Sequence, residues 1–154
     1  MKKIRIVAVG KHKFSFINQG LEEYQQRLEP FCRLEWTIIR ESRNQQPDRI
    51  VREETEILNR SLTGKGSACL LLDRVGQSFD SEQFAQRVGY YYQTSPELQF
   101  IIGGAYGVDR TGLNGIHESF SFSSMTFNHQ IIRLMLMEQI YRAFCILHGK
   151  PYHK

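Results

Sequence analysis

The apolar residues of this chain form four short compact runs and one short stretch that alternates with serine, separated by stretches in which apolar positions recur every three or four residues. Compact runs predict buried strands, and the recurrent spacing predicts amphipathic helices. The predicted strands are Ile4–Val9, Leu34–Ile39, Cys69–Leu72, Phe100–Ile102 and Ser119–Phe122. The predicted helices are Phe16–Glu29, the segment from Asp48 to the glycines at 64 and 66, the segment that begins at Asp80, a short irregular helix over Asp109–His117, and Asn128–His148. This alternation predicts a single α/β domain over residues 1–154, with a mainly parallel sheet covered on both faces.

Polar residues predict where three of these helices begin. Asp80 followed by Gln83 is typical of a capping box, and Asp48 and Asn128 are predicted N-caps. The segment Arg40–Pro47 contains no apolar residue, so it is predicted to be an exposed loop.

The last predicted helix carries two neighbouring apolar stripes. One stripe consists of Ile131, Leu134, Met135 and Cys145, and the other of Ile132, Leu136, Ile140, Ala143 and Leu147. A helix of a small domain usually buries one face, so the second stripe predicts either contact with another subunit or an unusually deep position in the core.

Composition is typical of a water-soluble globular protein. Of 154 residues, 41% are apolar and 23% are charged, and no apolar run approaches the length of a membrane span. The basic N-terminal segment has too short an apolar stretch for a secretory signal, so we expect a cytoplasmic protein with no membrane partner. Cys32, Cys69 and Cys145 are widely spaced among apolar residues, which favours buried reduced thiols over disulfides or a metal site.

The formal net charge of +4 permits a polyanionic partner without requiring one. Basic residues gather near both ends of the chain: Lys2, Lys3, Arg5, Lys11, His12 and Lys13 near the start, and Lys150, His153 and Lys154 at the end. If the two termini converge in space, these residues form a basic rim. A scatter of solubilising charges is the alternative interpretation.

Glycines follow the fourth predicted strand and suggest either a tight turn or a ligand site. Gly103, Gly104 and Gly107 would let the backbone approach a ligand closely, but a turn with positive φ explains them equally well. The segment TGKGSA at residues 63–68 lacks the spacing of a phosphate-binding loop, and no GxGxxG follows the first strand. A nucleotide triphosphatase and an ordinary dinucleotide site are therefore excluded.

Several segments together resemble one known family. They are IRIVAVGK at residues 4–11, LLLD at 70–73, FIIGGAYG at 100–107 and the C-terminal stretch SSMTFNHQIIRLMLMEQIYRAFCILHGKPYHK. The chain resembles the RlmH family of ribosomal RNA large-subunit pseudouridine methyltransferases, which belong to the knotted SPOUT class. One departure is Asn128, which stands where many relatives have Pro; both residues suit the start of a helix.

The resemblance implies a fold, a cofactor and partners that composition does not. It implies a C-terminal trefoil knot, a homodimer, and methylation of N3 of a pseudouridine in 23S ribosomal RNA on the assembled ribosome, with S-adenosylmethionine as the methyl donor. It also implies that the glycine turn borders the cofactor pocket. The implied cofactor residues are Leu72, Gly103, Gly104, Phe122, Ser123, Ser124, Met125, Thr126 and Phe127.

The candidate catalytic residues lie in the last helix and the tail that follows it: Arg142, Tyr152 and His153. Gly149 and Pro151 predict the end of the helix and an extended exit, which would present Tyr152 and His153 outward. Arg142 is either the partner of Glu138 in an ion pair or a group that holds the substrate base or a phosphate. His129 is expected to be a residue of the first helical turn, with catalysis as the less favoured interpretation.

Two other function classes remain open on sequence alone. One is a noncatalytic RNA-binding or ribosome-associated module, and the other is an α/β enzyme acting on a small molecule. Binding of S-adenosylmethionine separates the methyltransferase from the first, and dependence on ribosomes or ribosomal RNA separates it from the second.

Overall fold

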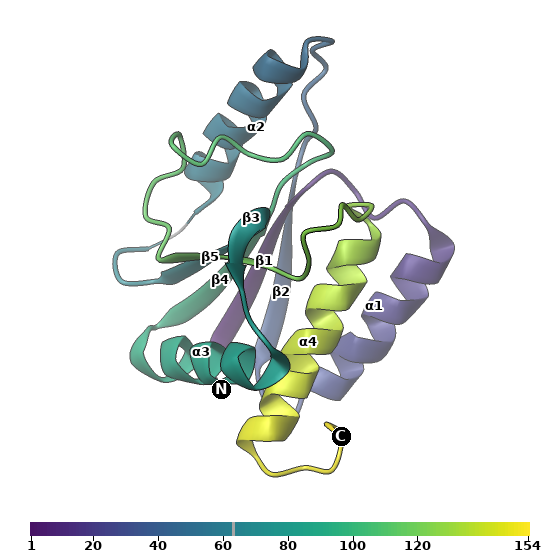
Figure 1. Cartoon of the computed structure of the whole chain (residues 1–154), viewed down its shortest axis with the longest axis vertical. Helices are drawn as coiled ribbons and strands as arrows, with labels where there is room; N and C mark the ends of the chain where they lie inside the picture. Colours follow the sequence, from purple (N-terminus) through teal and green to yellow (C-terminus); the bar gives the residue numbers. More distant parts are fainter. Residues whose placement is uncertain (63) are drawn as a thin grey trace.

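A computed structural model describes residues 1–62 and 64–154 as one α/β domain (Figure 1). The order of elements is β1 (Lys3–Val9), α1 (Ser15–Leu28), β2 (Arg33–Ile39), α2 (Pro47–Ser61), β3 (Ala68–Ser78), α3 (Ser81–Thr94), β4 (Glu97–Ile102), β5 (Glu118–Ser121) and α4 (Ile131–Leu147). Thr63, the first residue of the TGKGSA segment, lies outside the described residues.

The sheet has the strand order β2-β1-β4-β3-β5, and every pairing between these described strands is parallel. The prediction of an α/β domain with a mainly parallel sheet is therefore confirmed. β3 is longer than the apolar run Cys69–Leu72, because it passes through an irregularity after Leu72 and pairs with β5 again at Gln77 and Ser78.

Side chains on the two faces of the sheet form two separate cores. Ile4, Ile6 and Ala8 of β1 face the larger core, which α1, α3 and α4 cover. Val7 and Val9 of the same strand face a smaller core that contains Leu58 of α2 and Leu113 of the loop before β5. Figure 1 shows α4 beside α1, and α2 set apart from these helices. The period of two in a strand thus sends alternate residues to opposite layers.

Residues 109–117, all described, form turns and no helix, so that prediction is wrong. The Asp109 carboxylate accepts hydrogen bonds from the backbone N–H of Thr111 (3.1 Å) and from its hydroxyl (2.7 Å), which competes with helix formation. Gly115 has φ of +73°, which no helix contains. Asn59 of α2 donates to the Gly112 carbonyl at 2.5 Å, so the loop is held against α2.

The predicted helix starts differ in outcome. The capping box of Asp80 and Gln83 is confirmed, with both reciprocal hydrogen bonds formed. Asp48 is not an N-cap, because α2 begins one residue earlier at Pro47, a residue well suited to a first turn. Asn128 is not the N-cap of α4 either. It closes a turn before the helix by accepting from the Gln130 N–H at 2.8 Å.

The two stripes of α4 have different environments. Leu136, Ile140 and Ala143 of the second stripe are buried against the sheet of their own subunit. Ile131 of the first stripe is 41% exposed, and Leu134 and Met135 are half-buried. Cys145 of the first stripe is buried and Leu147 of the second is 42% exposed, so the part left uncovered in one chain is the N-terminal half of the first stripe.

The three cysteines are free and buried, as predicted. Burial raises the pKa of the Cys32 thiol to about 12 and that of Cys69 to about 11. Both thiols stay protonated at neutral pH and are poor nucleophiles.

Candidate functional site

A cavity of about 420 Å³ opens at the carboxyl ends of β3, β4 and β5. Ligands of parallel α/β sheets bind at this edge. Its walls come from three segments: residues 72–75 after the first part of β3, the glycine turn after β4, and the segment 121–127 after β5. The predicted cofactor residues that line it are Leu72, Gly103, Gly104, Phe122, Ser123, Met125, Thr126 and Phe127. Ser124 lies in the same segment without lining the cavity, and cofactor binding by the set stays a prediction.

The glycine turn owes its composition mainly to its own geometry. Gly104 and Gly107 form an isolated bridge, and Gly107 has φ of +77°. A Cβ on Gly103 would lie 2.8 Å from Val108 Cγ1, and a Cβ on Gly104 would lie 2.6 Å from Glu54 Oε1. Neither Glu54 nor Val9, the next neighbour of that Cβ, lines the cavity. A glycine is thus required at position 104 because a side chain there would collide with residues packed behind the turn.

Serine hydroxyls shape the segment after β5. Ser121 Oγ donates to the Ser123 carbonyl at 2.7 Å and accepts from the Ser123 N–H at 3.2 Å. Ser123 Oγ in turn accepts from the Met125 N–H at 3.1 Å. These contacts turn the chain around the cavity, and Met125 remains 70% exposed at its mouth.

His129 forms part of the cavity wall next to the start of α4. Its Nε2 atom is buried and has no hydrogen-bond partner among the described residues. Burial, and after it the positive charge of Arg133, lower the pKa of His129, so the ring is neutral at pH 7. A neutral imidazole with a free nitrogen at a cavity wall can exchange a proton or accept a hydrogen bond from a ligand.

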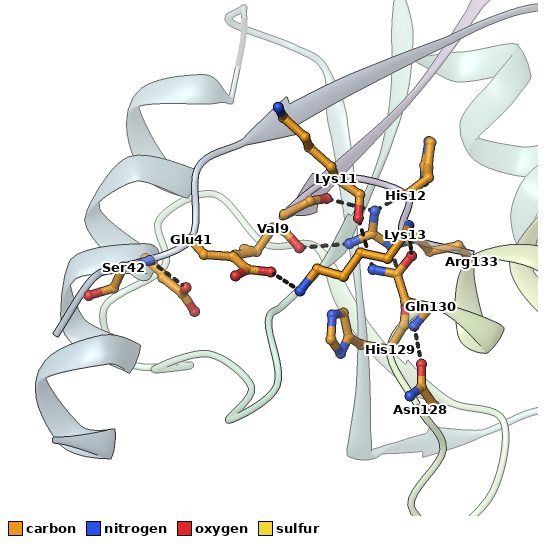
Figure 2. Close-up of polar contacts among 12 residues, drawn as sticks. Val9, Lys11, His12, Lys13, Glu41, Ser42, Asn128, His129, Gln130 and Arg133 are labelled. Atoms are coloured by element: carbon orange, nitrogen blue, oxygen red, sulfur yellow. Dashed lines mark hydrogen bonds and ion pairs between the residues drawn. The ribbon is translucent and has the colours of Figure 1, made fainter. Parts of the chain in front are cut away.

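Arg133 is a fully buried cation that the sequence pattern did not identify. Its guanidinium donates to the carbonyls of Val9 (2.6 Å) and Gly10 (2.7 Å) and contacts His12 Nδ1 at 3.1 Å. Figure 2 shows this guanidinium between the end of β1 and the start of α4. Desolvation lowers its pKa to about 10, which leaves it charged at neutral pH. Arg133 therefore ties the loop after β1 to α4.

Gln130 completes this tie. Its side chain accepts from the Lys13 N–H at 2.9 Å and donates to the Lys11 carbonyl at 2.9 Å. A helical pattern with one Gln and one Arg among apolar residues suggests an exposed polar face. The only signal of burial was that Arg133 lies between two apolar stripes.

The candidate catalytic residues form a second cluster around Glu138. Arg142 donates to Glu138 Oε1 from Nε (3.0 Å) and Nη2 (2.5 Å), so the predicted ion pair is confirmed. Arg142 Nη1 contacts His153 Nδ1 at 3.1 Å, and its guanidinium lies 4.8 Å from the centre of the Tyr152 ring. Arg142, Tyr152 and His153 are thus brought together.

The tail does not extend outward, and that prediction is wrong. Gly149 (φ +63°) ends α4, and the Lys150 N–H donates to the Cys145 carbonyl at 2.8 Å, which turns the chain back. Tyr152 OH then donates to Glu138 Oε1 at 3.1 Å and meets Tyr24 OH at 3.2 Å. Burial and these two hydrogen bonds raise the pKa of Tyr152, so its phenol is no base at neutral pH.

The two clusters lie at opposite ends of α4. Ile132 lines the cavity, and Arg142 follows ten residues later, about 15 Å along the helix axis. Figure 1 shows the C-terminus at the end of α4 far from the loops that precede the helix. Within one subunit, the tail cluster does not reach the cavity.

Comparison with known proteins gives the family. A family described as "Predicted SPOUT methyltransferase" matches residues 1–153. Proteins named ribosomal RNA large subunit methyltransferase H from Carboxydothermus hydrogenoformans and Thermotoga sp. are each 39% identical, with 99% and 98% of this chain and 99% of each relative covered. The protein of that name from Acetivibrio thermocellus is 36% identical over 99% of both chains. The chain belongs to the SPOUT methyltransferase family.

An apolar groove of about 660 Å³ lies between the cavity and the tail cluster of this SPOUT methyltransferase. It is bordered by the open stripe of α4 together with aromatic residues of neighbouring elements. The lining residues include Tyr24, Phe79, Phe84, Phe122, Ile131, Leu134, Met135 and Glu138. Phe122 also lines the cavity, and Glu138 also holds the tail, so the groove adjoins both clusters.

Within residues 1–62 and 64–154, no group of three or more His, Cys, Asp or Glu side chains is placed to hold a metal ion. None of the helices in that part of the chain is both long and apolar enough to cross a membrane.

Proposed function

We propose that this protein transfers the methyl group of S-adenosylmethionine to N3 of a pseudouridine in 23S ribosomal RNA on the assembled ribosome. Membership of the SPOUT methyltransferase family and the names of its relatives support this proposal. The observation that carries it is the cavity at the carboxyl ends of β3, β4 and β5. Ribosomal RNA as substrate also implies a cytoplasmic protein.

The residues present fit S-adenosylmethionine. A volume of about 420 Å³ is within the range of small-molecule sites. Leu72, Ile102 and Phe122 offer apolar surface for an adenine ring, and the glycine turn presents backbone groups that no side chain covers. When bound, the cofactor supplies a methyl group already activated by its sulfonium charge. Orientation of the acceptor is then the main task of the protein.

The residues of the tail cluster suit the acceptor base. Methylation at N3 requires that the N3 proton leave, and either His153 or a water molecule takes it. A guanidinium only donates hydrogen bonds, so its contact with His153 Nδ1 occupies the lone pair of that ring. His153 therefore accepts a proton only after Arg142 turns from it to the substrate. Such a turn would let Arg142 orient the base or its phosphate.

We infer further that the enzyme is a homodimer whose active site is shared. Within one subunit the tail cluster lies about 15 Å along α4 from the cavity, too far for direct transfer. The apolar groove between them is large enough to receive the matching face of a second copy, and a two-fold contact would bring each tail toward the other cavity. The trefoil knot implied by the family would fold segment 121–127 beside the glycine turn.

A complementation experiment tests the shared site. Deletion of residues 152–154 should leave cofactor binding nearly unchanged and abolish methyl transfer to ribosomes. Thr126→Trp, which places a bulky ring in the exposed mouth of the cavity, should block cofactor binding. A dimer of one subunit of each kind retains one intact cavity with one intact partner tail, so the isolated heterodimer should recover up to about half of the parent activity.

The readout is methyl transfer from labelled S-adenosylmethionine to ribosomes that lack the modification, followed by mass mapping of the ribosomal RNA. Failure of the parent protein to bind S-adenosylmethionine would favour the noncatalytic RNA-binding module. Full activity of the tail-deleted homodimer would show that Tyr152 and His153 are bystanders, and the catalytic assignment would move to Arg142 and His129.

A further inference from the structure

The edge of the sheet that holds the cavity continues beyond it. β1 lies next to β4, and β2 lies next to β1. The loops after these two strands therefore follow the cavity along the same edge, about 5 and 10 Å away at the usual spacing of strands. The first loop consists of residues 10–14 after β1. The second consists of residues 40–46 after β2, and it leads directly into α2.

These loops and the first half of α2 carry exposed cations that have no acidic partner. None of them takes part in an ion pair among residues 1–62 and 64–154. We call this set the basic edge, and it consists of Lys11, Arg40, Arg43, Arg49 and Arg52. Nearby Lys13 differs, because it pairs with Glu41 at 2.9 Å.

Two of the acidic residues near the basic edge form hydrogen bonds with the loop after β2. Glu53 accepts hydrogen bonds from Ser42 Oγ and from Asn44 Nδ2, the latter at 3.3 Å. Glu54 is buried, and its Oε2 accepts from the Ser42 N–H at 2.9 Å. Hydrogen bonds from Ser42 and Asn44, and after them the charges of Arg40 and Arg49, lower the pKa of Glu53. These carboxylates hold the loop in place and form no ion pair with the guanidinium groups of the basic edge.

The loop after β2 is fixed although it has no apolar residue. Asn44 Oδ1 accepts from the N–H groups of Gln45 (2.9 Å) and Gln46 (3.1 Å), and Ser42 Oγ accepts from the Asn44 N–H at 3.0 Å. A fixed loop loses less conformational entropy when it binds a partner than a flexible one does. The arginines of this loop are therefore preorganised.

The basic edge is also fixed relative to the cavity. The loop after β1 is held to the start of α4 by Gln130 and Arg133, and it is joined to the loop after β2 by the pair of Lys13 and Glu41. Figure 2 shows these contacts and the Lys11 side chain extending away from them. His129 of the cavity wall lies directly before Gln130 in the sequence.

The basic rim that was expected where the two termini converge is not the source of the positive charge at the basic edge. The strand β1 separates Lys2, Lys3 and Arg5 at one end of the sheet from Lys11 and Lys13 at the other. Lys3 and Arg5 are paired with Glu97, and Lys3 also with Glu35. The cations of the N-terminal strand therefore do not contribute to the basic edge.

We propose that the basic edge is a docking surface for ribosomal RNA phosphates that sets the position of the target nucleotide over the cavity. The inference rests on the proposed function, because it assigns a binding surface for the RNA substrate. Arginine presents a planar fork of donors that matches the oxygens of a phosphodiester. RNA and protein would meet along a strip running from the loop after β2 to the cavity.

The test compares two double variants of equal charge. Arg40→Gln with Arg43→Gln removes two cations of the basic edge. Arg60→Gln with Lys65→Gln removes two exposed cations at the opposite edge, where α2 ends and β3 begins; neither forms an ion pair with a described residue. Both variants should keep the melting temperature and the affinity for S-adenosylmethionine of the parent, since neither alters the cavity.

The first variant should lower kcat/KM for ribosomes by about tenfold, with most of the loss in KM, whereas the second should change it less than about twofold. The slope of log kcat/KM against log salt should decrease by about 1.4 to 1.8 for two lost phosphate contacts. Arg40→Lys with Arg43→Lys keeps the charge and should retain most of the salt slope.

Any of the following results would overturn the inference. Equal losses in both double variants would show that net charge alone matters, and parent activity in the first variant would show that the basic edge is a solvated face. A loss without any change in salt slope would point to a ribosomal protein as the contact. A parent that binds the cofactor and methylates no ribosomes would overturn the proposed function itself, and with it this surface.

Discussion

Replacement of Gly104 by alanine should destabilise the protein through a contact with Glu54, and not through the cofactor. The added Cβ would lie 2.6 Å from Glu54 Oε1 and 3.2 Å from Val9 Cγ1. The first distance is about 0.8 Å below ordinary van der Waals contact. Glu54 cannot swing away freely, because it is buried and its Oε2 holds the Ser42 N–H. Overpacking of this kind costs about 1–3 kcal/mol.

A double-mutant cycle isolates that contact. Glu54→Ala removes the carboxylate and makes room, so Gly104→Ala should cost about 1 kcal/mol less in that background than in the parent. Glu54→Gln keeps the same bulk and serves as the control, because Gly104→Ala should cost as much there as in the parent. Urea unfolding at neutral pH gives each free energy, and 1 kcal/mol corresponds to about 2–4 °C in melting temperature for a chain of this length.

The same variants test what the glycine does for the ligand. The Cβ points toward Glu54 and Val9, neither of which lines the cavity. Calorimetry should therefore give Gly104→Ala/Glu54→Ala the same affinity for S-adenosylmethionine as Glu54→Ala alone. The reasoning fails if Gly104→Ala is as stable as the parent, if the costs are additive with Glu54→Ala, or if the double variant loses cofactor affinity.

Three further predictions concern other parts of the molecule. Gly76→Ala should lower the free energy of unfolding by about 3 kcal/mol or more, because the added Cβ would lie 2.6–2.7 Å from backbone atoms of Phe120. A soluble variant whose free energy of unfolding in denaturant equals that of the parent would contradict this. Burial lowers the pKa of His12 and His129, so the free energy of unfolding should fall as pH drops from 7 toward 5. Replacing both histidines by glutamine should flatten this dependence, and an unchanged slope would refute the assignment. Met135→Glu in the groove should yield a monomer by light scattering, whereas Tyr90→Glu, at an exposed position of α3, should leave a dimer. A parent protein that is monomeric at micromolar concentration would show that the dimer proposal is wrong.

The sign of the histidine effect follows from which state binds protons more tightly. The unfolded chain protonates these two histidines near pH 6.5, and the folded protein protonates them only at lower pH. Acidification through this range therefore favours the unfolded state. Burial raises the pKa of Glu54, so that carboxyl acts with the opposite sign, and Glu54→Gln should steepen the loss of stability.

Repeating local patterns allowed most of the fold to be predicted. Compact apolar runs located β1 to β4, because burial on both faces of a parallel sheet requires apolar residues at consecutive positions, and alternation of serine and phenylalanine located β5. The errors lie where a polar side chain decides the backbone, as with the Asp109 turn in place of a helix. Gly76 was not identified either, because its close approach to β5 depends on a pairing partner more than forty residues away in sequence.

The candidate site was predicted unevenly for a related reason. Strand ends pointed to the cavity, since the carboxyl ends of parallel strands share one edge. Arg133 carried no such signal, because a single cation in an apolar helix is more often exposed, and its burial depends on carbonyls of β1 that only the fold brings near. The predicted orientation of the tail was wrong because it depends on the contacts that Tyr152 makes with Glu138 and with Tyr24.

The length of α4 gives a geometric reason for the proposed dimer. Its first turn fixes the loop after β1 through Arg133, its middle borders the apolar groove, and its last turns hold the tail through Glu138 and Arg142. Along a straight helix, Ile132 at the cavity and Arg142 of the tail cluster stay about 15 Å apart. If the tail acts on a base held over the cavity, that tail must come from another subunit. Dimerisation would then be a requirement of the chemistry, and monomeric variants with an intact cavity should bind the cofactor normally and transfer no methyl group.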